Sequence, residues 1–393
     1  MKVLVVDDHA FIRRSLGVML RGLGYADILE AENGEQALTL MRAHPGQIDI
    51  VFCDLMMPGR DGIETLRDVV ENAPKAAVVL MSGEDERVLG AAGDLAVSHG
   101  LRVLGTLAKP ITADQVRGLL TRAARPEAHR PKRAAFDVEP ADLARGIAAG
   151  EIFPVYQPKV SLDGGAFVGV EALARWRHPT LGLVPPDAFI PLAEAHGLIC
   201  GLTDQVLHQS IAQCGVWHAK GLVLDVSVNV SGEDFVRLDL PEDILAQARG
   251  AGIEPARVVL EVTESRIAND PTALLDITAR LRLKGFGLSI DDFGTGFSSM
   301  AQLRRLPFTE LKIDRQFVGG ALTSDASRSI LESSVDLARK LKLTVAVEGV
   351  ETRAEWDLVA ALGCDLAQGY FIGRPMPGAE IVAWAAGWRA RPD

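Results

Sequence analysis

The sequence predicts an α/β protein of two domains, a doubly wound five-stranded parallel sheet followed by a TIM-like (β/α)8 barrel. Apolar runs of strand length alternate with helical patterns in both parts of the chain, which is typical of α/β folds. The length of 393 residues suits two to three domains of about 150 residues each. Hydrophobic residues make up 48% of the chain, which suffices for two cores.

The first alternation spans residues 1–123, where five strand-like runs are each followed by a helical pattern. This order predicts a parallel sheet with helices on both faces. The predicted strands are residues 3–6, 28–31, 48–53, 77–81 and 102–107. The predicted helices are residues 11–22, 34–43, 62–71, 88–98 and 113–122.

Polar residues stand where these strands end, and doubly wound sheets bind ligands outside the carboxyl ends of their strands. Each residue alone has a simpler explanation as a helix cap or a solvated loop residue. Three acids brought close together repel one another unless a divalent cation holds them. A carboxylate beside such a cation can attack a phosphoryl donor. The residues at these strand ends are Asp7, Asp8, Asp54, Ser82 and Lys109.

With these residues the segment resembles the response-regulator receiver domain over residues 1–123. The resemblance implies that Asp54 accepts a phosphoryl group from a phosphohistidine of a sensor histidine kinase or phosphotransfer protein. It also implies a Lys109–Pro110 cis bond, a Mg²⁺ site and a pair of switch residues. The magnesium ligands would be Asp7, Asp8, Asp54 and the Met56 carbonyl, and the switch residues would be Ser82 and Lys109.

One position departs from the family pattern. Thr106 stands three residues before Lys109, where receiver domains usually carry an aromatic side chain that changes rotamer on phosphorylation. The segment from Ser82 to Lys109 is also longer than is typical of the family. We therefore expect the output surface of this domain to signal by a different motion.

Residues 124–139 are predicted to link the two domains, because Pro, Ala and basic residues alternate there without apolar periodicity. Residues 140–150 then form a short predicted helix. The net charge of -11 and the lack of a helix-turn-helix pattern argue against DNA binding. No apolar run approaches the ~20 residues of a membrane helix, and the few apolar residues at the start do not suit a signal sequence. The four cysteines suit reduced thiols, so we expect a cytoplasmic protein.

Residues 140–393 form the predicted second domain, in which eight strand-like runs are mostly separated by helical patterns. This number fits a TIM-like barrel, whose chemistry gathers at the carboxyl ends of the strands. The predicted strands are residues 153–156, 167–173, 224–230, 258–262, 287–290, 310–313, 344–347 and 370–372. The predicted helices are residues 186–196, 204–220, 241–251, 272–283, 327–341 and 354–362.

Polar residues again mark the strands, and several are acids. A carboxylate inside an apolar strand is costly without a partner, and several like charges that converge require cations. Oxygen ligands without His or Cys favour Mg²⁺ or Mn²⁺. The residues are Glu171 in the second strand, Asn229 and Glu261 at the ends of the third and fourth, Asp291 and Asp292 after the fifth, Lys312 in the sixth, Glu348 at the end of the seventh, and Gln368 before the eighth.

The pair Asp291-Asp292 allows two interpretations. Asp and Gly are common at strand-to-turn boundaries, so the stretch Asp-Asp-Phe-Gly alone could be only a turn. Alternatively, both carboxylates hold metal ions, which requires the strand to end or twist at this pair because neighbouring strand residues point to opposite faces. Two ions about 3.5–4 Å apart would then support phosphoester hydrolysis by in-line attack.

At Glu171-Ala172-Leu173 the chain resembles the EAL family of cyclic di-GMP phosphodiesterases, and the resemblance runs from about residue 140 to residue 380. A lone Glu-Ala-Leu would carry no information, but an ordered series of family motifs follows. The others are Tyr156-Gln157-Pro158-Lys159, Arg175-Trp176, Asn229, Glu261-Val262-Thr263-Glu264, Asp291-Asp292-Phe293-Gly294-Thr295-Gly296, Lys312-Ile313-Asp314, Glu348-Gly349-Val350-Glu351 and Gln368-Gly369-Tyr370.

The resemblance implies that the chain hydrolyses cyclic di-GMP to linear pGpG with two Mg²⁺ or Mn²⁺ ions and a bridging water. One ion would be held by Glu171, Asn229, Glu261 and Asp291, and the other by Asp291, Asp292 and Glu348. The catalytic residues would be Lys312, which orients the water, Glu348, the candidate proton acceptor, and Asp292. Guanine or phosphate would be held by Gln157, Leu173, Arg175, Glu351 and Gln368, while Glu264 would anchor the loop after Asp292.

These observations favour an enzyme whose activity is modulated by phosphorylation of Asp54. A catalytically silent receptor for cyclic di-GMP is the alternative, and such a protein would have lost metal ligands or the loop after Asp292. A scaffold that acts through protein contacts of the receiver domain is a third interpretation. No diguanylate cyclase motif is present. A homo-oligomer is expected, since EAL barrels often pair.

Overall fold

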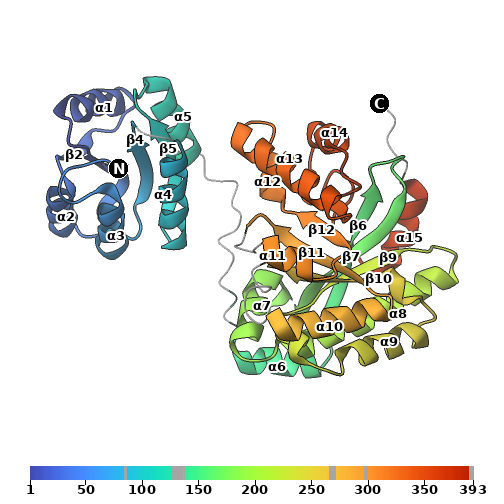
Figure 1. The fold of residues 1–393 in the computed structure, drawn as a ribbon. Helices are drawn as coiled ribbons and strands as arrows, with labels where there is room; N and C mark the ends of the chain where they lie inside the picture. Colours follow the sequence, from blue (N-terminus) through green and yellow to red (C-terminus); the bar gives the residue numbers. More distant parts are fainter. Residues whose placement is uncertain (84–85, 125–135, 137, 265–270, 296–299, 389–393) are drawn as a thin grey trace. The chain divides into compact units, whose positions relative to one another are not determined.

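The computed structural model consists of two compact units, Met1–Ala134 and Ala135–Asp393. It describes residues 1–83, 86–124, 136, 138–264, 271–295 and 300–388. Most of the predicted linker lies outside these residues, so its boundaries stay a prediction. Figure 1 shows the first unit in blue to teal and the second in green to red.

The first unit contains a five-stranded parallel sheet in the order β2-β1-β3-β4-β5. Every element predicted for this domain is confirmed, with bounds that differ by at most two residues. The strands are β1 (Lys2–Val6), β2 (Asp27–Ala31), β3 (Ile48–Asp54), β4 (Ala77–Ser82) and β5 (Arg102–Ala108). The helices are α1 (Ala10–Gly22), α2 (Gly34–Ala43), α3 (Gly62–Asn72), α4 (Glu86–Ser98) and α5 (Ala113–Ala124).

Side-chain alternation divides this unit into two hydrophobic cores. Val3 and Val5 of β1 face one core and Leu4 and Val6 face the other, because successive strand residues point to opposite faces. Helices α1 and α5 cover the first core, and α2, α3 and α4 cover the second. Both faces are therefore apolar, and polar chemistry is left to the carboxyl ends of the strands.

The second unit contains a closed barrel of eight strands, as predicted. The pairings of β6 with β14 and with β7 close the barrel. A short additional strand, β8 (Gly182–Val184), pairs with the end of β7. The barrel strands are β6 (Ile152–Ser161), β7 (Phe167–His178), β9 (Asp225–Asn229), β10 (Val258–Thr263), β11 (Gly287–Phe293), β12 (Glu310–Ile313), β13 (Thr344–Val347) and β14 (Leu366–Gln368).

One strand of the barrel is reversed. Strand β6 runs antiparallel to both of its neighbours, whereas the strands of a regular (β/α)8 barrel are all parallel. The cause is the short turn at residues 162–166, which joins β6 to β7 without a helix and is closed by a hydrogen bond from Ser161 N to Ala166 O. A turn this short can only join antiparallel strands.

The predicted strand at residues 370–372 is wrong. The last strand is β14, four residues earlier, so Gln368 lies in the strand rather than before it. The chain turns at Gly369, whose carbonyl accepts hydrogen bonds from Ile372 N and Gly373 N. These local bonds satisfy the backbone without a sheet partner, and the apolar residues that suggested a strand include Ile372, which packs into the barrel core instead.

Helices surround the barrel (Figure 1) and pack on the outward-facing strand residues, such as Val226, Val228, Leu260 and Val262. The predicted helices are confirmed, and α11, α12 and α15 are additional. No described helix combines the length and apolar character that crossing a membrane requires. The helices are α6 (Pro140–Ala148), α7 (Pro186–Ala195), α8 (Ile199–Ala219), α9 (Leu240–Gly250), α10 (Pro271–Leu283), α11 (Met300–Arg305), α12 (Arg315–Gly320), α13 (Asp325–Lys340), α14 (Arg353–Leu362) and α15 (Gly378–Gly387).

Candidate functional site

The first unit brings two acids and one lysine together at the carboxyl edge of its sheet. Lys109 Nζ lies 2.8 Å from Asp7 Oδ2 and 2.6 Å from Asp54 Oδ2. Asp7 and Asp54 are almost completely buried. Burial raises the pKa of Asp54, while its hydrogen bond with Lys109 acts in the opposite direction. The ammonium group thus keeps two buried carboxylates at one site.

The other predicted residues of this pocket surround that group. Ser82 is buried, and its carbonyl accepts a hydrogen bond from Lys109 N. The backbone N–H of Met56 donates to Asp54 Oδ1 at 3.3 Å. Asp8 belongs to a cluster with Asp7 and His9 whose ligand atoms all lie within 4.8 Å of one another.

The Lys109–Pro110 bond is cis, as the resemblance implied. Thr106 lies in β5 and is exposed. The pairing of β5 with β4 shifts by one residue just before it, between Val103 and Gly105, and Gly105 has φ 148. A β-bulge of this kind changes the direction of the side chains that follow it.

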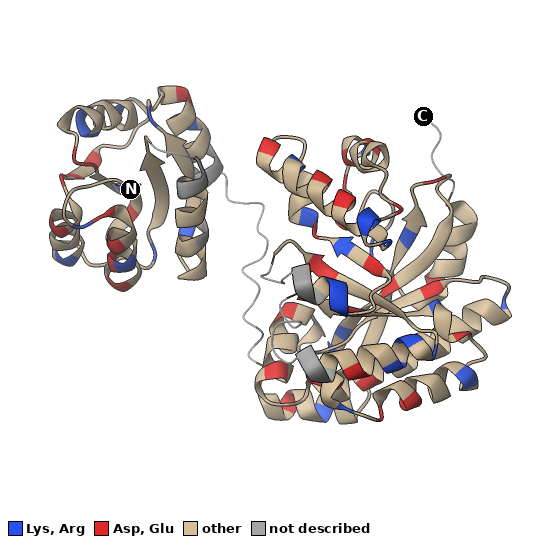
Figure 2. Ribbon diagram, in the orientation of Figure 1, with Lys and Arg blue, Asp and Glu red and all other residues tan. Residues whose placement is uncertain are grey.

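The interior of the barrel carries the second cluster, which is built around one lysine. Figure 2 shows acidic residues in red and basic residues in blue on strands of the barrel. Lys312 in β12 is 1% exposed, and its ammonium group contacts carboxylates from four other strands or strand ends. The distances from Lys312 Nζ are 2.6 Å to Glu348 Oε1, 2.9 Å to Glu261 Oε2, 3.0 Å to Asp291 Oδ1 and 3.5 Å to Glu171 Oε2. The four acids that the sequence placed on separate strands therefore meet at one point.

The acids form two overlapping triplets. Glu171, Glu261 and Asp291 offer oxygen atoms that lie within 4.8 Å of one another, and so do Asp291, Asp292 and Glu348. Asp291 belongs to both triplets. Each triplet offers only carboxylate oxygens, the ligands that Mg²⁺ and Mn²⁺ prefer.

The backbone at Asp292 explains how two neighbouring acids reach one site. Asp292 has φ 55, in the left-handed region that few residues other than glycine adopt. The pairing of β11 with β12 shifts between Ile290 and Phe293. The strand is therefore distorted at this pair, which allows Asp291 and Asp292 to join the same triplet.

Three amide side chains complete the polar interior. Asn229 Nδ2 donates to Glu171 Oε1 at 2.9 Å, and Gln368 Nε2 donates to Glu171 Oε2 at 2.6 Å and to Gln157 Oε1 at 3.0 Å. Gln157 Nε2 in turn donates to the carbonyl of Gly373. These bonds fix both oxygens of Glu171, the acid of the Glu-Ala-Leu motif.

Burial and the neighbouring lysines together set the pKa values of these carboxyl groups. It raises the pKa of Glu348, although Lys312 opposes the shift, and it raises the pKa of Asp292 to about 6. At Glu261 the effect of burial is outweighed by Lys312 and Lys159, which together lower the pKa of this carboxyl group. Glu261 is therefore held ionised more firmly than Glu348 or Asp292.

The remaining predicted residues lie around this cluster. Arg175 follows Leu173 by two positions along β7, so both point to the same face as Glu171. Glu264 is buried, and its Oε2 accepts a hydrogen bond from Gly294 N at 2.8 Å. Residues 296–299 of the loop lie outside the described residues. Glu351 is exposed, and its backbone N–H donates to Glu355.

A second polar layer inside the barrel was missed by the sequence reasoning. We define the lower polar layer as Lys159, Ser227, Ser289 and Glu310, all of which are buried. Lys159 Nζ lies 2.6 Å from Ser227 Oγ, 3.2 Å from Glu261 Oε1 and 3.4 Å from Glu310 Oε1. The period-two spacing of Gln157 and Lys159 in β6 was the available signal, because it places both side chains on the inner face.

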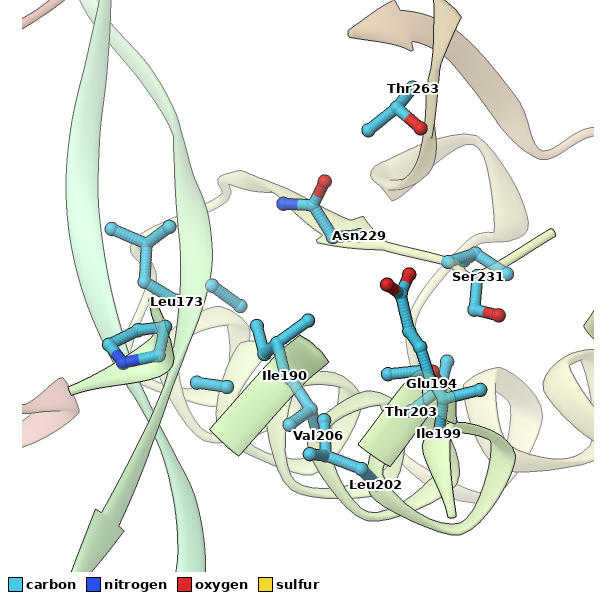
Figure 3. Close-up of a pocket in the computed structure, with 14 residues that line it drawn as sticks. Leu173, Ile190, Glu194, Ile199, Leu202, Thr203, Val206, Asn229, Ser231 and Thr263 are labelled. Carbon is cyan, nitrogen blue, oxygen red and sulfur yellow. The ribbon is translucent and has the colours of Figure 1, made fainter. Parts of the chain in front are cut away.

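A cavity of about 240 Å³ adjoins the carboxylates and was also missed. Figure 3 shows its lining, with Ile190 and Glu194 from α7, Leu202 and Val206 from α8, and Asn229 opposite them. Asn229 thus faces both this cavity and Glu171. Most of the lining is apolar, with a few polar side chains such as Glu194, Asn229 and Ser231, which is typical of a ligand pocket. Apolar helix residues gave no sequence signal for it.

Comparison with known families identifies both units. The response regulator receiver domain matches residues 3–121, and the EAL domain matches residues 141–375, more than half of the chain. The chain therefore belongs to the EAL family and carries a receiver domain before its EAL domain.

Several named proteins are similar to this chain. Cyclic di-GMP phosphodiesterase RocR of Pseudomonas aeruginosa is 36% identical over 98% of this chain and 99% of its own length. Cyclic di-GMP phosphodiesterase NbdA of the same organism is 40% identical over 63% of this chain, but the chain spans only 32% of NbdA. A solved structure described as PaMucR phosphodiesterase in complex with c-di-GMP is 40% identical, with a TM-score of 0.59, and covers 61% of this chain and 98% of that one.

Proposed function

We propose that the chain is a response regulator that hydrolyses cyclic di-GMP to linear pGpG. The observation that carries the proposal is the pair of carboxylate triplets that share Asp291 at the carboxyl end of an EAL barrel. The similarity to RocR supports it, because that relative aligns with this chain across both of its domains, along 99% of its own length, and is named as a cyclic di-GMP phosphodiesterase.

The residues of the barrel fit two divalent ions. Each triplet provides three carboxylate oxygens without nitrogen or sulfur donors, as Mg²⁺ and Mn²⁺ prefer. Glu171, Asn229, Glu261 and Asp291 would hold one ion, and Asp291, Asp292 and Glu348 the other. Bound ions of this kind supply a nucleophile at neutral pH and polarise the phosphoryl oxygens.

Side chains of the barrel provide the remaining functions. Lys312 offsets negative charge that develops on the phosphate in the transition state. Glu348 is a fitting proton acceptor, because burial raises its pKa towards neutrality. Arg175 can hold two phosphate oxygens with its planar guanidinium group. The other proposed substrate contacts are Gln157, Leu173, Glu351 and Gln368.

The cavity beside Asn229 suits a guanine base. An apolar cavity of about 150 Å³ holds a benzene ring, and this one is larger, at about 240 Å³. Its apolar walls from α7 and α8 can stack on a flat ring, and Glu194 and Ser231 can accept or donate hydrogen bonds at its edge (Figure 3). Asn229 connects this cavity with the acids, so a base bound there would direct its phosphate towards them.

Turnover tests the proposed function directly. We expect the purified full-length chain to convert cyclic di-GMP to pGpG in Mg²⁺ or Mn²⁺, and to lose this activity in EDTA. Chromatography of the products measures the rate, and a binding titration under the same conditions measures affinity. Tight binding without pGpG formation in either metal would instead favour a catalytically silent receptor.

The receiver domain is proposed to regulate the barrel. Asp54 is the proposed phosphoacceptor, with Asp7, Asp8 and the Met56 carbonyl around one Mg²⁺ ion and Ser82 and Lys109 as switch contacts. The phosphoryl donor would be a sensor histidine kinase or a phosphotransfer protein. Self-association of the chain is also proposed.

Phosphorylation should therefore change turnover. We expect a small-molecule phosphodonor to change the turnover of the wild type by about fivefold or more, within the usual range of allosteric coupling, and to leave Asp54→Asn unaffected. The exposed Asp114 in α5 provides a matched control, since Asp114→Asn should respond like the wild type. Equal rates for wild type and Asp54→Asn with and without the donor would contradict the proposal.

A further inference from the structure

The lower polar layer has no role in the function proposed above. The interior of a TIM barrel is usually filled with Val, Ile and Leu, and a buried charge is costly without a partner. Here Lys159 and Glu310 are both buried within the barrel, at 3% and 7% exposure. A charged pair at this position therefore needs interactions that offset the cost of burying it.

The reversed direction of β6 explains how the lysine reaches the acids. Gln157 pairs with Glu171, and Lys159, two residues further along, pairs with Gly169. Because β6 runs against β7, Lys159 lies one layer closer than Gln157 to the amino ends of the parallel strands. From that layer the long side chain reaches Ser227 on β9 and Glu261 on β10.

Glu261 is consequently held from both sides. Lys312 Nζ contacts its Oε2 at 2.9 Å, and Lys159 Nζ contacts its Oε1 at 3.2 Å. Two ammonium groups on different oxygens of one carboxylate limit the rotation of that carboxylate. A ligand whose orientation is set in advance loses less freedom when it binds an ion.

Glu310 balances the positive charge of Lys159. An unbalanced ammonium group next to a cation site would repel the cation. Glu310 Oε1 lies 3.4 Å from Lys159 Nζ and accepts a hydrogen bond from Ser289 Oγ at 3.0 Å. The pair is formally neutral, so Lys159 can orient Glu261 without adding net charge beneath the acids.

We propose that Lys159, balanced by Glu310, is a positioning residue that orients Glu261 for metal binding. The proposal rests on the metal site of the proposed function. A positioning pair and a purely structural ion pair have different measurable consequences. A structural pair affects only stability, whereas a positioning pair also sets the affinity for the ion.

A charge-balanced double variant separates these consequences. Lys159→Met/Glu310→Gln keeps the net charge and nearly the volume of the pair but removes the ammonium group from Glu261. We expect the barrel of this variant to bind Mn²⁺ about tenfold to a hundredfold more weakly, the range known for outer partners of metal ligands. Electron paramagnetic resonance of free Mn²⁺ during titration of the full-length chain measures the affinity, and circular dichroism checks the fold.

Two further variants serve as references. Asp291→Asn removes the shared ligand of the barrel and so reports the Mn²⁺ binding of the receiver domain. Thr278→Val changes a fully buried polar residue of α10 and should leave the affinity unchanged. A folded double variant with the affinity of the wild type overturns the positioning role.

Two other experimental outcomes also test the proposal. If the double variant does not fold, Glu310→Gln alone provides the test, because it leaves Lys159 with Glu261 as its carboxylate partner. The unbalanced charge should then weaken Mn²⁺ binding, and unchanged binding overturns the proposal. If wild type and Asp291→Asn bind Mn²⁺ equally, the barrel has no such site and the proposed function fails as well.

Discussion

Asp291→Asn should abolish the metal-dependent hydrolysis of cyclic di-GMP. Asp291 belongs to both carboxylate triplets, so its replacement removes a charged ligand from each proposed ion site. Each ion contributes several kcal/mol of transition-state stabilisation, and about 1.4 kcal/mol corresponds to a factor of ten in rate. We therefore expect a loss of at least about three orders of magnitude in kcat/KM, measured as pGpG formation in Mn²⁺.

Two further variants serve as comparisons for Asp291→Asn. Asp163→Asn changes an exposed aspartate in the turn between β6 and β7 and should be as active as the wild type. Asp292→Asn removes a ligand from one triplet only, and Asn tolerates the left-handed conformation at this position. We expect it to lower affinity for one ion and to retain binding of the other. Near-normal turnover of Asp291→Asn would rule out the shared-ligand arrangement.

Lys312→Met should have an effect of similar size on turnover and a second effect on stability. The ammonium group contacts four carboxylates at 2.6–3.5 Å and is almost completely buried. Its removal leaves those acids uncompensated, which costs roughly 3–5 kcal/mol for a buried pair that loses one partner. The loss of transition-state stabilisation by one fixed donor costs about 10²–10³ in kcat. We expect kcat to fall while the affinity for cyclic di-GMP is mostly kept.

Metal ions should partly reverse the stability effect. Unfolding of the variant in EDTA should occur at a clearly lower temperature than unfolding of the wild type. Added Mn²⁺ should stabilise the variant more than the wild type, because acids without the Lys312 ammonium group attract the cation more strongly and binding to the native state stabilises it by mass action. Lys340→Met, which removes an exposed lysine paired with Asp336, is the matched control. Wild-type unfolding in EDTA together with wild-type kcat would refute the role of Lys312.

Much of the fold could be predicted from the sequence because each element has its own local pattern. Alternating apolar runs located the five strands of the first unit and seven of the eight barrel strands. The reversal of β6 follows from a short turn. The pattern of apolar residues does not show that this turn makes β6 antiparallel to its neighbours. The last strand was placed too late, because the buried Ile372 belongs to a turn that satisfies its own hydrogen bonds.

The candidate site could be predicted only in part, for a similar reason. Residues at the ends of strands, such as Glu261 and Glu348, could be located because parallel strands end at the same edge. Lys159 lies within β6 between apolar residues, and its contact with Glu261 crosses the barrel. The cavity lined by Ile190 and Val206 depends on the packing of α7 against α8. Contacts of this kind need the tertiary structure.

The left-handed backbone at Asp292 has a consequence for the evolution of the protein. A non-glycine residue in this region costs on the order of 1 kcal/mol or more of stability, and glycine at position 292 would relieve that cost. Selection for heat resistance alone would therefore replace Asp292 and remove a proposed metal ligand with it. Selection for turnover opposes this change, which is the usual conflict between stability and activity. Position 292 should accordingly reveal, in any evolved or engineered variant, which of the two properties was under selection.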